Sequence, residues 1–215
     1  MTQRIPTDLL LEAYASGIFP MGMPDGEIRW FSPDPRGIIP IKGFRTPHGL
    51  SRALKKPDWI IRIDTAFPEV MRACAQREET WITEEIVKSY HLLFQQGHAH
   101  SVEVWLGDQL AGGLYGVCIG GAFFGESMFH RATDASKVAL WYLVTILSEG
   151  GFTLLDSQWT TSHLEQFGAR EIPRENYLER LREAISLETT FAKPGIFERS
   201  SRNQGIETSR WRDAG

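Results

Sequence analysis

Residues 110–128 read LAGGLYGVCIGGAFFGESM, and this stretch decides the fold. Apolar and aromatic side chains run from Leu110 to Cys118 and again from Ala122 to Met128, with Ile119-Gly120-Gly121 between the two runs. Two such runs joined by a short glycine-containing turn predict an antiparallel β-hairpin. Because an apolar hairpin must be covered by other elements, we expect the flanking sequence to supply helices and further strands.

The segment after the hairpin predicts a buried helix followed directly by a strand. Asp134 is a candidate N-cap for a helix that runs to Glu149 and ends at Gly150-Gly151. This helix is apolar on nearly all sides, which is typical of a buried helix. Its main apolar stripe consists of Leu140, Leu143, Val144 and Leu147, widened by Trp141 and Ile146. Further elements expected downstream are a strand over residues 152–156 and helices over residues 163–167 and 174–186.

The segment before the hairpin predicts short helices and strands in alternation. A helix over residues 6–16 should end at Gly17, whereas the prolines and glycine within residues 18–24 predict no regular element there. The cluster over residues 32–37 predicts a turn and a domain boundary. The other upstream elements expected are a helical turn over 51–56, strands over 59–63 and 101–105, and helices over 67–76 and 83–96, the last capped by Thr83.

This order of elements predicts an α/β or α+β protein with a mixed sheet. We expect a small N-terminal domain over residues 1–34, a larger domain over residues 35–190 and a loose polar tail over residues 191–215.

Composition excludes several classes of protein. Only two cysteines, Cys74 and Cys118, are present, and they form no CxxC pair, so the sequence predicts neither a zinc knuckle nor a disulfide framework. No apolar run is long enough to span a membrane and no signal peptide opens the chain, which favours a reduced, cytoplasmic protein. The net charge of −4 argues mildly against a nucleic-acid binder, because such proteins are usually basic.

Two carboxylates and one amide in apolar surroundings are the candidates for chemistry. The chain has no GxxxxGK[ST] phosphate loop and no GxSxG motif, and His98 and His100 lack a third metal ligand. Asp156 ends an apolar run, and Gln158, two residues later on an extended chain, should face the same side. Asp156 could therefore sit at a ligand-binding sheet edge or merely cap the helix that follows it. Glu126 lies within the second apolar run of the predicted hairpin, in the string GAFFGESMF (121–129).

Eight strings in a fixed order resemble the leucyl/phenylalanyl-tRNA–protein transferase family. They are LEAYASGIFP (11–20), WFSPDPR (30–36), TWI (80–82), GHAHSVEVW (97–105), GGLYG (112–116), GESMF (125–129), DASK (134–137) and DSQ (156–158). The match covers residues 9 to 181. The resemblance implies a small N-terminal domain followed by a domain like the acyl-CoA N-acyltransferases. It also implies an enzyme that moves Leu, Phe or less readily Met from aminoacyl-tRNA to proteins with N-terminal Arg or Lys, which marks them for N-end rule degradation.

The resemblance also implies substrate-binding positions. For the apolar side chain of the donor these are Leu114, Phe123, Leu140, Leu143, Leu147 and Leu155, although all six could equally be plain core. Trp81 and Tyr90 belong to an aromatic set that could line a pocket or fill the core. Met21 stands where some members have Trp, so an aromatic stack on the terminal adenine of the tRNA is not expected from this residue.

A mechanism can be argued from the chemistry of the substrates. The donor is an activated ester, so no ATP site or other cofactor is expected. The acceptor α-amine has an ordinary pKa of about 8. We expect Asp156 to accept or relay the proton of the amine and Gln158 to orient the amine by hydrogen bonding. Glu126 is the expected receptor for the cationic acceptor, unless it pairs with Arg131 instead. A local basic patch for tRNA is expected at Arg45, Arg52, Lys55 and Lys56.

Two other functions remain open at this point. An acyl-CoA-dependent N-acyltransferase of similar fold should carry a glycine-rich pyrophosphate loop at the start of a helix, but the helix after Asp134 opens with DASK. A tRNA-binding module without catalysis would not need Asp156 and Gln158 beside an apolar set. Binding of acetyl-CoA, or tRNA binding without peptide-bond formation, would identify one or the other.

Overall fold

The structure is a computed structural model of the chain, and it describes residues 4–56, 58–77 and 80–197. Its elements are, in order, α1 (Thr7–Ala15), β1 (Phe19–Gly22), β2 (Ile28–Phe31), β3 (Arg36–Ile39), α2 (His48–Ala53), β4 (Trp59–Ile63), α3 (Phe67–Ala75), α4 (Glu84–Gln95), β5 (Ala99–Leu106), β6 (Gln109–Ile119), β7 (Ala122–His130), α5 (Ala135–Glu149), β8 (Leu154–Gln158), α6 (Ser162–Glu165), β9 (Arg170–Ile172), α7 (Arg174–Ile185) and β10 (Gly195–Ile196).

An eight-stranded sheet forms the centre of the molecule, in the order β10-β4-β5-β6-β7-β8-β3-β9. The predicted hairpin is confirmed as β6 and β7, which pair antiparallel from Gly112↔His130 to Ile119↔Ala122. Only β7 and β8 pair in parallel among the described strands, and a parallel pair needs a long crossover connection. The buried helix α5 provides that crossover, so the mixed sheet expected from the sequence is confirmed.

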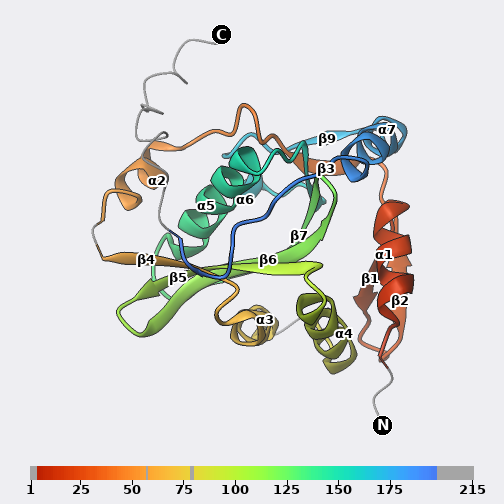
Figure 1. Cartoon of the computed structure of the whole chain (residues 1–215), viewed down its shortest axis with the longest axis horizontal. Coiled ribbons are helices and arrows are strands. Elements are labelled where there is room, and N and C mark those ends of the chain that lie inside the picture. The colour runs from red at the N-terminus through yellow and green to blue at the C-terminus, as the bar shows by residue number, and fades with distance from the viewer. Residues whose placement is uncertain (1–3, 57, 78–79, 198–215) are drawn as a thin grey trace.

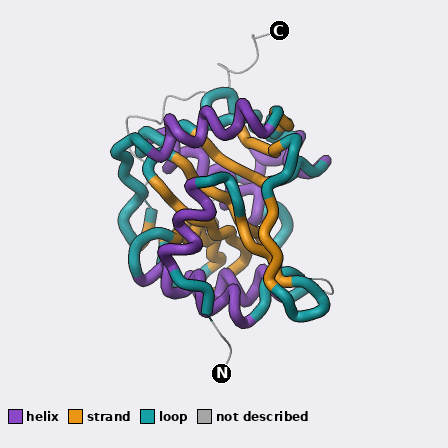
Figure 2. The backbone as a smooth tube through the Cα atoms, turned by 90° about the vertical axis from the view of Figure 1, so that its right-hand side faces the viewer, coloured by secondary structure: helices purple, strands orange, loops and turns teal. Residues whose placement is uncertain are grey.

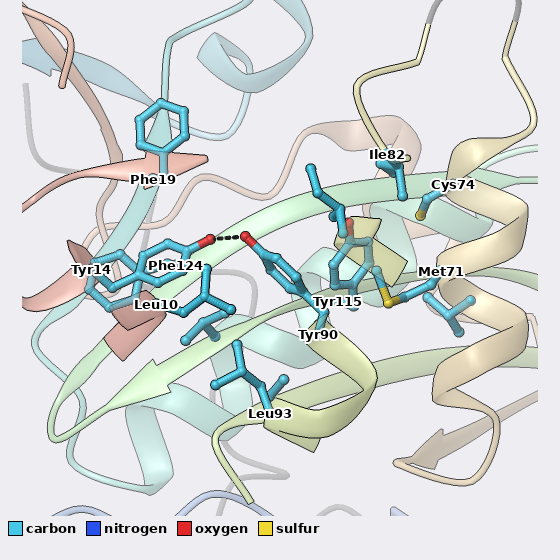
Figure 3. Packing of buried hydrophobic residues seen from close by; sticks show 14 of the residues in the cluster. Leu10, Tyr14, Phe19, Met71, Cys74, Ile82, Tyr90, Leu93, Tyr115 and Phe124 are labelled. Atoms are coloured by element: carbon cyan, nitrogen blue, oxygen red, sulfur yellow. Dashed lines mark hydrogen bonds between the residues drawn. The ribbon is translucent and has the colours of Figure 1, made fainter. Parts of the chain in front are cut away.

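Helices cover the sheet on both faces (Figure 1). The helix α5 packs on β5, β6 and β7 from one side, and α3 and α4 pack from the other. Each face has its own apolar core, because successive side chains of a strand point to opposite faces. The stripe predicted on α5 is buried in the first core, with Leu143 and Leu147 almost inaccessible to solvent. The second core contains four buried tyrosines, Tyr14, Tyr90, Tyr115 and Tyr177, and Figure 3 shows the first three.

A small N-terminal unit of α1, β1 and β2 lies at one end of the sheet, and Figure 2 views the molecule from that side. The prediction of no regular element over residues 18–24 was wrong, because Phe19–Gly22 forms β1 and pairs with β2. Proline cannot donate to a ladder and is found on edge strands, and Pro20 lies in a ribbon of only two strands. The turn expected over 32–37 is shorter than predicted, since Arg36 already opens β3.

Local capping predictions had mixed outcomes. Thr83 caps α4 as expected, since its side chain accepts a hydrogen bond from the backbone N–H of Ile86 at 3.4 Å. The prediction that Asp134 caps α5 was wrong: its backbone is left-handed (φ 72°), and its carboxylate pairs with Lys137 at 2.9 Å instead. The predicted helical turn at 51–56 begins earlier, as α2, directly after Pro47.

The segment from Phe191 onward was predicted to be loose, and for residues 191–197 this was wrong. Phe191 stacks on His100 and Phe123, with ring centroids 4.2 and 5.7 Å apart. Gly195 and Ile196 form β10, which pairs with β4. The rest of the predicted tail, residues 198–215, lies outside the described residues. An aromatic residue and a short edge strand therefore extend the fold beyond the last predicted helix.

Candidate active site

The site opens where the parallel strands β7 and β8 separate. Their pairing ends at Phe124↔Asp156, although both strands continue. Extending this register by two residues on each strand would place Glu126 opposite Gln158. The two side chains therefore lie on opposite sides of the opening. The Gln158 amide donates to a Glu126 carboxylate oxygen at 3.4 Å. Strand divergence thus brings together the two candidates that lie 32 residues apart in sequence.

Two hollows meet at this opening. The larger has a volume of about 490 Å³, and its lining includes Phe19, Met21, Trp81 and Trp159. The smaller has a volume of about 120 Å³ and is lined mainly by apolar side chains, including Leu114, Leu140, Leu143 and Leu155. Six residues line both hollows: Glu126, Ser127, Met128, Ser157, Gln158 and Leu164. The four polar ones, Glu126, Ser127, Ser157 and Gln158, form a polar seam. This seam separates a wide cavity from a narrow apolar slot.

Asp156 is fully buried and surrounded by donors. It receives hydrogen bonds from Arg36 Nε at 2.9 Å and Nη2 at 2.6 Å, from the Tyr177 hydroxyl at 2.7 Å and from the Gln158 backbone N–H at 2.8 Å. A carboxylate accepts about four hydrogen bonds, so none of its capacity is left for a substrate. Asp156 does not cap the following helix: Thr161 is the N-cap of α6.

Arg36 connects the N-terminal unit to this carboxylate. Its guanidinium is fully buried, forks onto Asp156 and donates through Nη1 to the backbone oxygen of Gly17 at 2.9 Å. It also lies over the rings of Phe19 and Tyr177, at 4.9 and 4.5 Å from their centroids. A buried charge is tolerated when it is paired and hydrogen-bonded in this way. Burial by itself would lower the pKa of Arg36, but the hydrogen bonds and the charge of Asp156, together with other nearby acidic groups, outweigh it and raise the pKa above its ordinary value.

Backbone geometry at the end of β8 aims the Gln158 side chain. Gln158 has a φ of 59°, in the left-handed region that few non-glycine residues adopt. Its N–H is held by Asp156, and the next residue lies against β3, where a Cβ on Gly37 would be 2.5 Å from the carbonyl carbon of Trp159. Gly37 is thus required for this close approach. Asp156 and Gly37 together fix the direction in which Gln158 points.

Glu126 has a different environment, with hydroxyl donors instead of a guanidinium. Tyr14 of α1 donates to Oε1 at 2.7 Å, and the Tyr14 and Tyr90 hydroxyls hydrogen-bond to each other (Figure 3). Because each hydroxyl has one proton, Tyr90 of α4 donates either to Tyr14 or to Oε2, which is 3.4 Å away. Burial raises the pKa of Glu126 to about 8, and Asp156 adds to the rise, while Tyr14 and Arg36 oppose it. The expected alternative pairing with Arg131 is contradicted, since Arg131 donates to the carbonyl of Leu110.

The other predicted site residues fall into three groups. Met21 and Trp81 line the wide cavity, and Tyr90 lies behind Glu126. Phe123 and Leu147 are fully buried core residues that line neither hollow. The predicted tRNA patch is exposed on and around α2: Arg45, Arg52, Lys55 and Lys56. These basic residues line neither of the two hollows.

Sequence reasoning missed three contributors: Tyr14, Arg36 and Tyr177. Arg36 had a signal, because it directly precedes the apolar run Gly37-Ile38-Ile39 and a buried carboxylate requires a cation or several donors. Tyr14 and Tyr177 had none, because each looks like an ordinary apolar position of an amphipathic helix. Within the described ranges, no group of three or more His, Cys, Asp or Glu side chains could hold a metal ion, and no helix is long and apolar enough to cross a membrane.

Comparison with known proteins agrees with the motifs. The sequence model described as leucyl/phenylalanyl-tRNA protein transferase matches residues 38–182, and that of its N-terminal domain matches residues 4–34. A leucyl/phenylalanyl-tRNA–protein transferase from Paramagnetospirillum magneticum is 54% identical over 188 residues, covering 85% of this chain and 90% of the relative. One from Salinibacter ruber is 50% identical over 188 residues, covering 87% and 83%.

A solved structure with a looser likeness is that of a GCN5-related N-acetyltransferase-like protein from Streptococcus suis, with a TM-score of 0.37, 15% identity, and coverage of 77% of this chain and 64% of that one. The family assignment rests on the sequence matches, which span both the N-terminal unit and the strands and helices that form the site. The chain belongs to the leucyl/phenylalanyl-tRNA protein transferase family.

Proposed function

We propose that this enzyme transfers Leu or Phe from aminoacyl-tRNA to proteins whose N-terminal residue is Arg or Lys. The observation that carries the proposal is the polar seam with Glu126 at its centre, between a cavity wide enough for a nucleotide and a peptide end and a slot fit for one apolar side chain. The family's name supports an aminoacyl-tRNA donor. The acidic seam supports a cationic acceptor.

The apolar slot is proposed to hold the side chain of the donor. Leu114, Leu140, Leu143 and Leu155 come from β6, α5 and β8 and leave a space of about 120 Å³. Ligand pockets of this kind are mostly apolar, with few polar groups to fix orientation. Phe123 and Leu147 act behind the slot as packing and not as contacts. Leucine and phenylalanine fit this lining because neither brings a polar group that would lack a partner.

The acceptor is proposed to bind at Glu126. The raised pKa means that this carboxyl exchanges its proton near the pH at which an α-amine does. A cation that binds beside it favours the ionised form, so binding of Arg or Lys would lower its pKa again. An acidic N-terminal residue would bring a carboxylate into the site with no cation to pair with it, since Glu126 then stays in its neutral form, and a buried unpaired charge is costly. The proposed specificity for cationic acceptors follows from this asymmetry.

Catalysis is proposed to depend mainly on positioning. The amine attacks the ester carbonyl, a C–N bond forms, the C–O bond between the acyl group and the ribose breaks, and the proton lost by the amine ends on the ribose oxygen. Gln158 can accept from the attacking amine or donate to it through its amide. Asp156, whose acceptor positions are all occupied, acts through Gln158 by fixing its backbone. This supports a positioning role for Asp156 over the proton acceptance expected from the sequence.

The tRNA end is proposed to enter the wide cavity beside Met21 and Trp81, with the duplex reaching the basic patch around α2. The Trp81 ring is available for stacking on a base, whereas Met21 offers a softer apolar contact. No carboxylate forms an ion pair with Arg45, Arg52 or Lys55 among the described residues, so all three can neutralise phosphates.

The direct test uses labelled Leu-tRNA and three acceptor proteins that differ only in the first residue: Arg, Lys or Glu. Labelling of the Arg and Lys proteins but not of the Glu protein is expected. Strong labelling of the Glu protein would contradict the acceptor assignment, and no labelling of any would contradict the transfer itself. A parallel reaction with labelled acetyl-CoA tests the acyl-CoA alternative.

A further inference from the structure

A second, basic cavity lies at the opposite end of β8 from the active site. Its volume is about 280 Å³, and it is lined by the end of β3, the start of β8 and the side chains of Lys42, Arg170 and Arg180. The strand runs from Leu154 at this cavity to Gln158 at the site, which is about 13 Å at roughly 3.3 Å per residue. Ile39 and Leu155 line both this cavity and the apolar slot.

The charge of this cavity is unbalanced. Its lining contains one lysine and two arginines and no acidic residue. All three are exposed, and none makes an ion pair or side-chain hydrogen bond within the part of the chain that the structure describes. Elsewhere on the surface, Arg29, Lys137 and Arg174 are paired with carboxylates. Three unpaired cations around one hollow, in a chain of net charge −4, create a local potential that favours an anion.

Three separate elements hold these cations in place. Arg170 opens β9 and pairs with Ile38 of β3, Arg180 projects from α7, and Lys42 follows β3 directly after Pro40 and Ile41. Arg170 belongs to the packed sheet, Arg180 to a helix and Lys42 to the turn that follows β3, so the fold sets the spacing of the three Cα atoms. Such spacing suits a ligand with several fixed negative charges.

Arg45, which belongs to the basic patch around α2, lies close in the chain and in space to residues beside the cavity. The Arg45 backbone N–H donates to Phe167 at 2.9 Å, and the Arg45 side chain lies 3.5 Å from where a Cβ on Gly168 would be. Gly168 stands two residues before Arg170. Arg45 therefore stands near Arg170 on the side of the cavity that leads to α2, and a nucleic acid, with its regularly spaced phosphates, could contact the cavity and the α2 patch together.

We propose that the cavity lined by Lys42, Arg170 and Arg180 binds backbone phosphates of the donor tRNA, away from its aminoacylated end. The inference rests on the proposed function, because it takes the aminoacyl ester to lie at Gln158. It assigns to this cavity the anchoring of the tRNA body, whereas the site at Glu126 and Gln158 handles only the reacting end.

The test is a triple variant, Lys42→Ala, Arg170→Ala and Arg180→Ala. Binding of deacylated tRNA is measured by fluorescence anisotropy from 50 to 300 mM salt. Each lost phosphate contact should reduce the slope of log Kd against log salt by about 0.9, so three contacts predict a reduction of about two to three. We expect Kd, and KM for Leu-tRNA, to rise at least about tenfold near 0.15 M salt. Transfer from 3′-leucyl-adenosine, which lacks the tRNA body, should keep its wild-type rate.

A matched control removes three other exposed cations, Arg4, Arg72 and Arg182, none of which lines the cavity. Both triple variants have a net charge of −7, which is −4 minus 3, so equal losses in the two would assign the effect to overall charge and overturn the proposal. Arg182 lies on the same helix as Arg180, which makes the two single substitutions a matched pair.

Other outcomes separate this proposal from the proposed function. Wild-type tRNA affinity and salt slope in the cavity variant, with transfer intact, would overturn the cavity assignment alone. Loss of tRNA binding in that variant, with no transfer by the wild type, would uphold the cavity and overturn the transfer. Binding of inorganic phosphate at the cavity with no effect on tRNA would also overturn it.

Discussion

The two carboxylates of the site have opposite surroundings. Asp156 faces a buried guanidinium and has all its acceptor positions filled, whereas Glu126 faces tyrosine hydroxyls, lines two hollows and has a pKa raised to about 8. A carboxylate with a cation fixed beside it holds structure in place. A carboxylate without one can receive a cation from outside. The neighbours of each residue, and not its type, therefore determine its role.

The largest effect is expected from Arg36→Met, which removes the cation of the first carboxylate. Asp156 would be left charged, buried and without its main partner, which costs about 3–5 kcal/mol of the free energy of unfolding. The double variant Arg36→Met with Asp156→Leu should recover much of this loss, because an apolar pair leaves no charge unpaired. Urea unfolding of the three proteins checks this, and a loss below about 1 kcal/mol in Arg36→Met would contradict the account.

Glu126→Gln should change how stability depends on pH. The folded carboxyl has a pKa of about 8 against an ordinary 4.5, so the folded state binds more protons than the unfolded state between these values. The free energy of unfolding should therefore fall as pH rises through this window, by at most about 1.4 kcal/mol per pH unit. The contribution is fully present below pH 4.5 and lost above pH 8.

Unfolding of wild type and Glu126→Gln at several pH values gives the difference directly. The variant, which has no proton to lose, should show a shallower decline between pH 5 and pH 8. Parallel curves for the two proteins would mean that Glu126 resembles Asp156 in holding its charge.

Leu143→Trp tests whether the slot beside Glu126 holds the side chain of the donor. Overpacking typically costs about 1–3 kcal/mol, and the larger phenylalanyl group should suffer more than the leucyl group. The measurement is kcat/KM for Phe-tRNA and Leu-tRNA with one Arg-initiated acceptor. An equal loss for both donors, with normal thermal stability, would exclude Leu143 from the donor site.

The double variant Lys55→Glu and Lys56→Glu should change the chemistry at Asp156 and Glu126 least of all, because both lysines lie far from these carboxylates in the chain and line neither hollow. We expect a higher KM for charged tRNA, a flatter salt dependence and a nearly unchanged kcat. A lower kcat with an unchanged KM would mean that the α2 patch acts on the chemistry instead of on tRNA binding.

The sequence predicted what depends on near neighbours. The hairpin β6–β7, the helix α5 and the Thr83 cap are encoded by local patterns, and all three are confirmed. Gln158 and Glu126 could be named as candidates because polar residues in apolar runs are conspicuous. The transferase family could be identified because eight short motifs occur in a fixed order along the chain.

Long-range partners could not be predicted. Arg36 and Asp156 are 120 residues apart, and Tyr14 and Glu126 are 112 apart, so no local pattern joins them. Strand β1 was missed because Pro20 and Gly22 are typical of irregular segments, whereas this strand forms through its pairing with β2. Asp134 adopts a left-handed backbone that its position before a helix did not indicate. Apart from Asp134, each failure concerns a contact between residues that are not neighbours in the chain.

The central claim, that Asp156 positions Gln158 and does not itself accept the proton, is tested by Asp156→Asn. Asparagine keeps the size of the side chain but replaces one acceptor oxygen with a donor, which cannot face Arg36. The kcat of wild type and variant is measured between pH 7 and 9, with thermal stability as the folding control. The account predicts a loss of about 10², the usual cost of misplacing a catalytic group, that is the same at every pH. Recovery of the rate toward pH 9, where more of the acceptor amine is already neutral, would contradict it and make Asp156 the base.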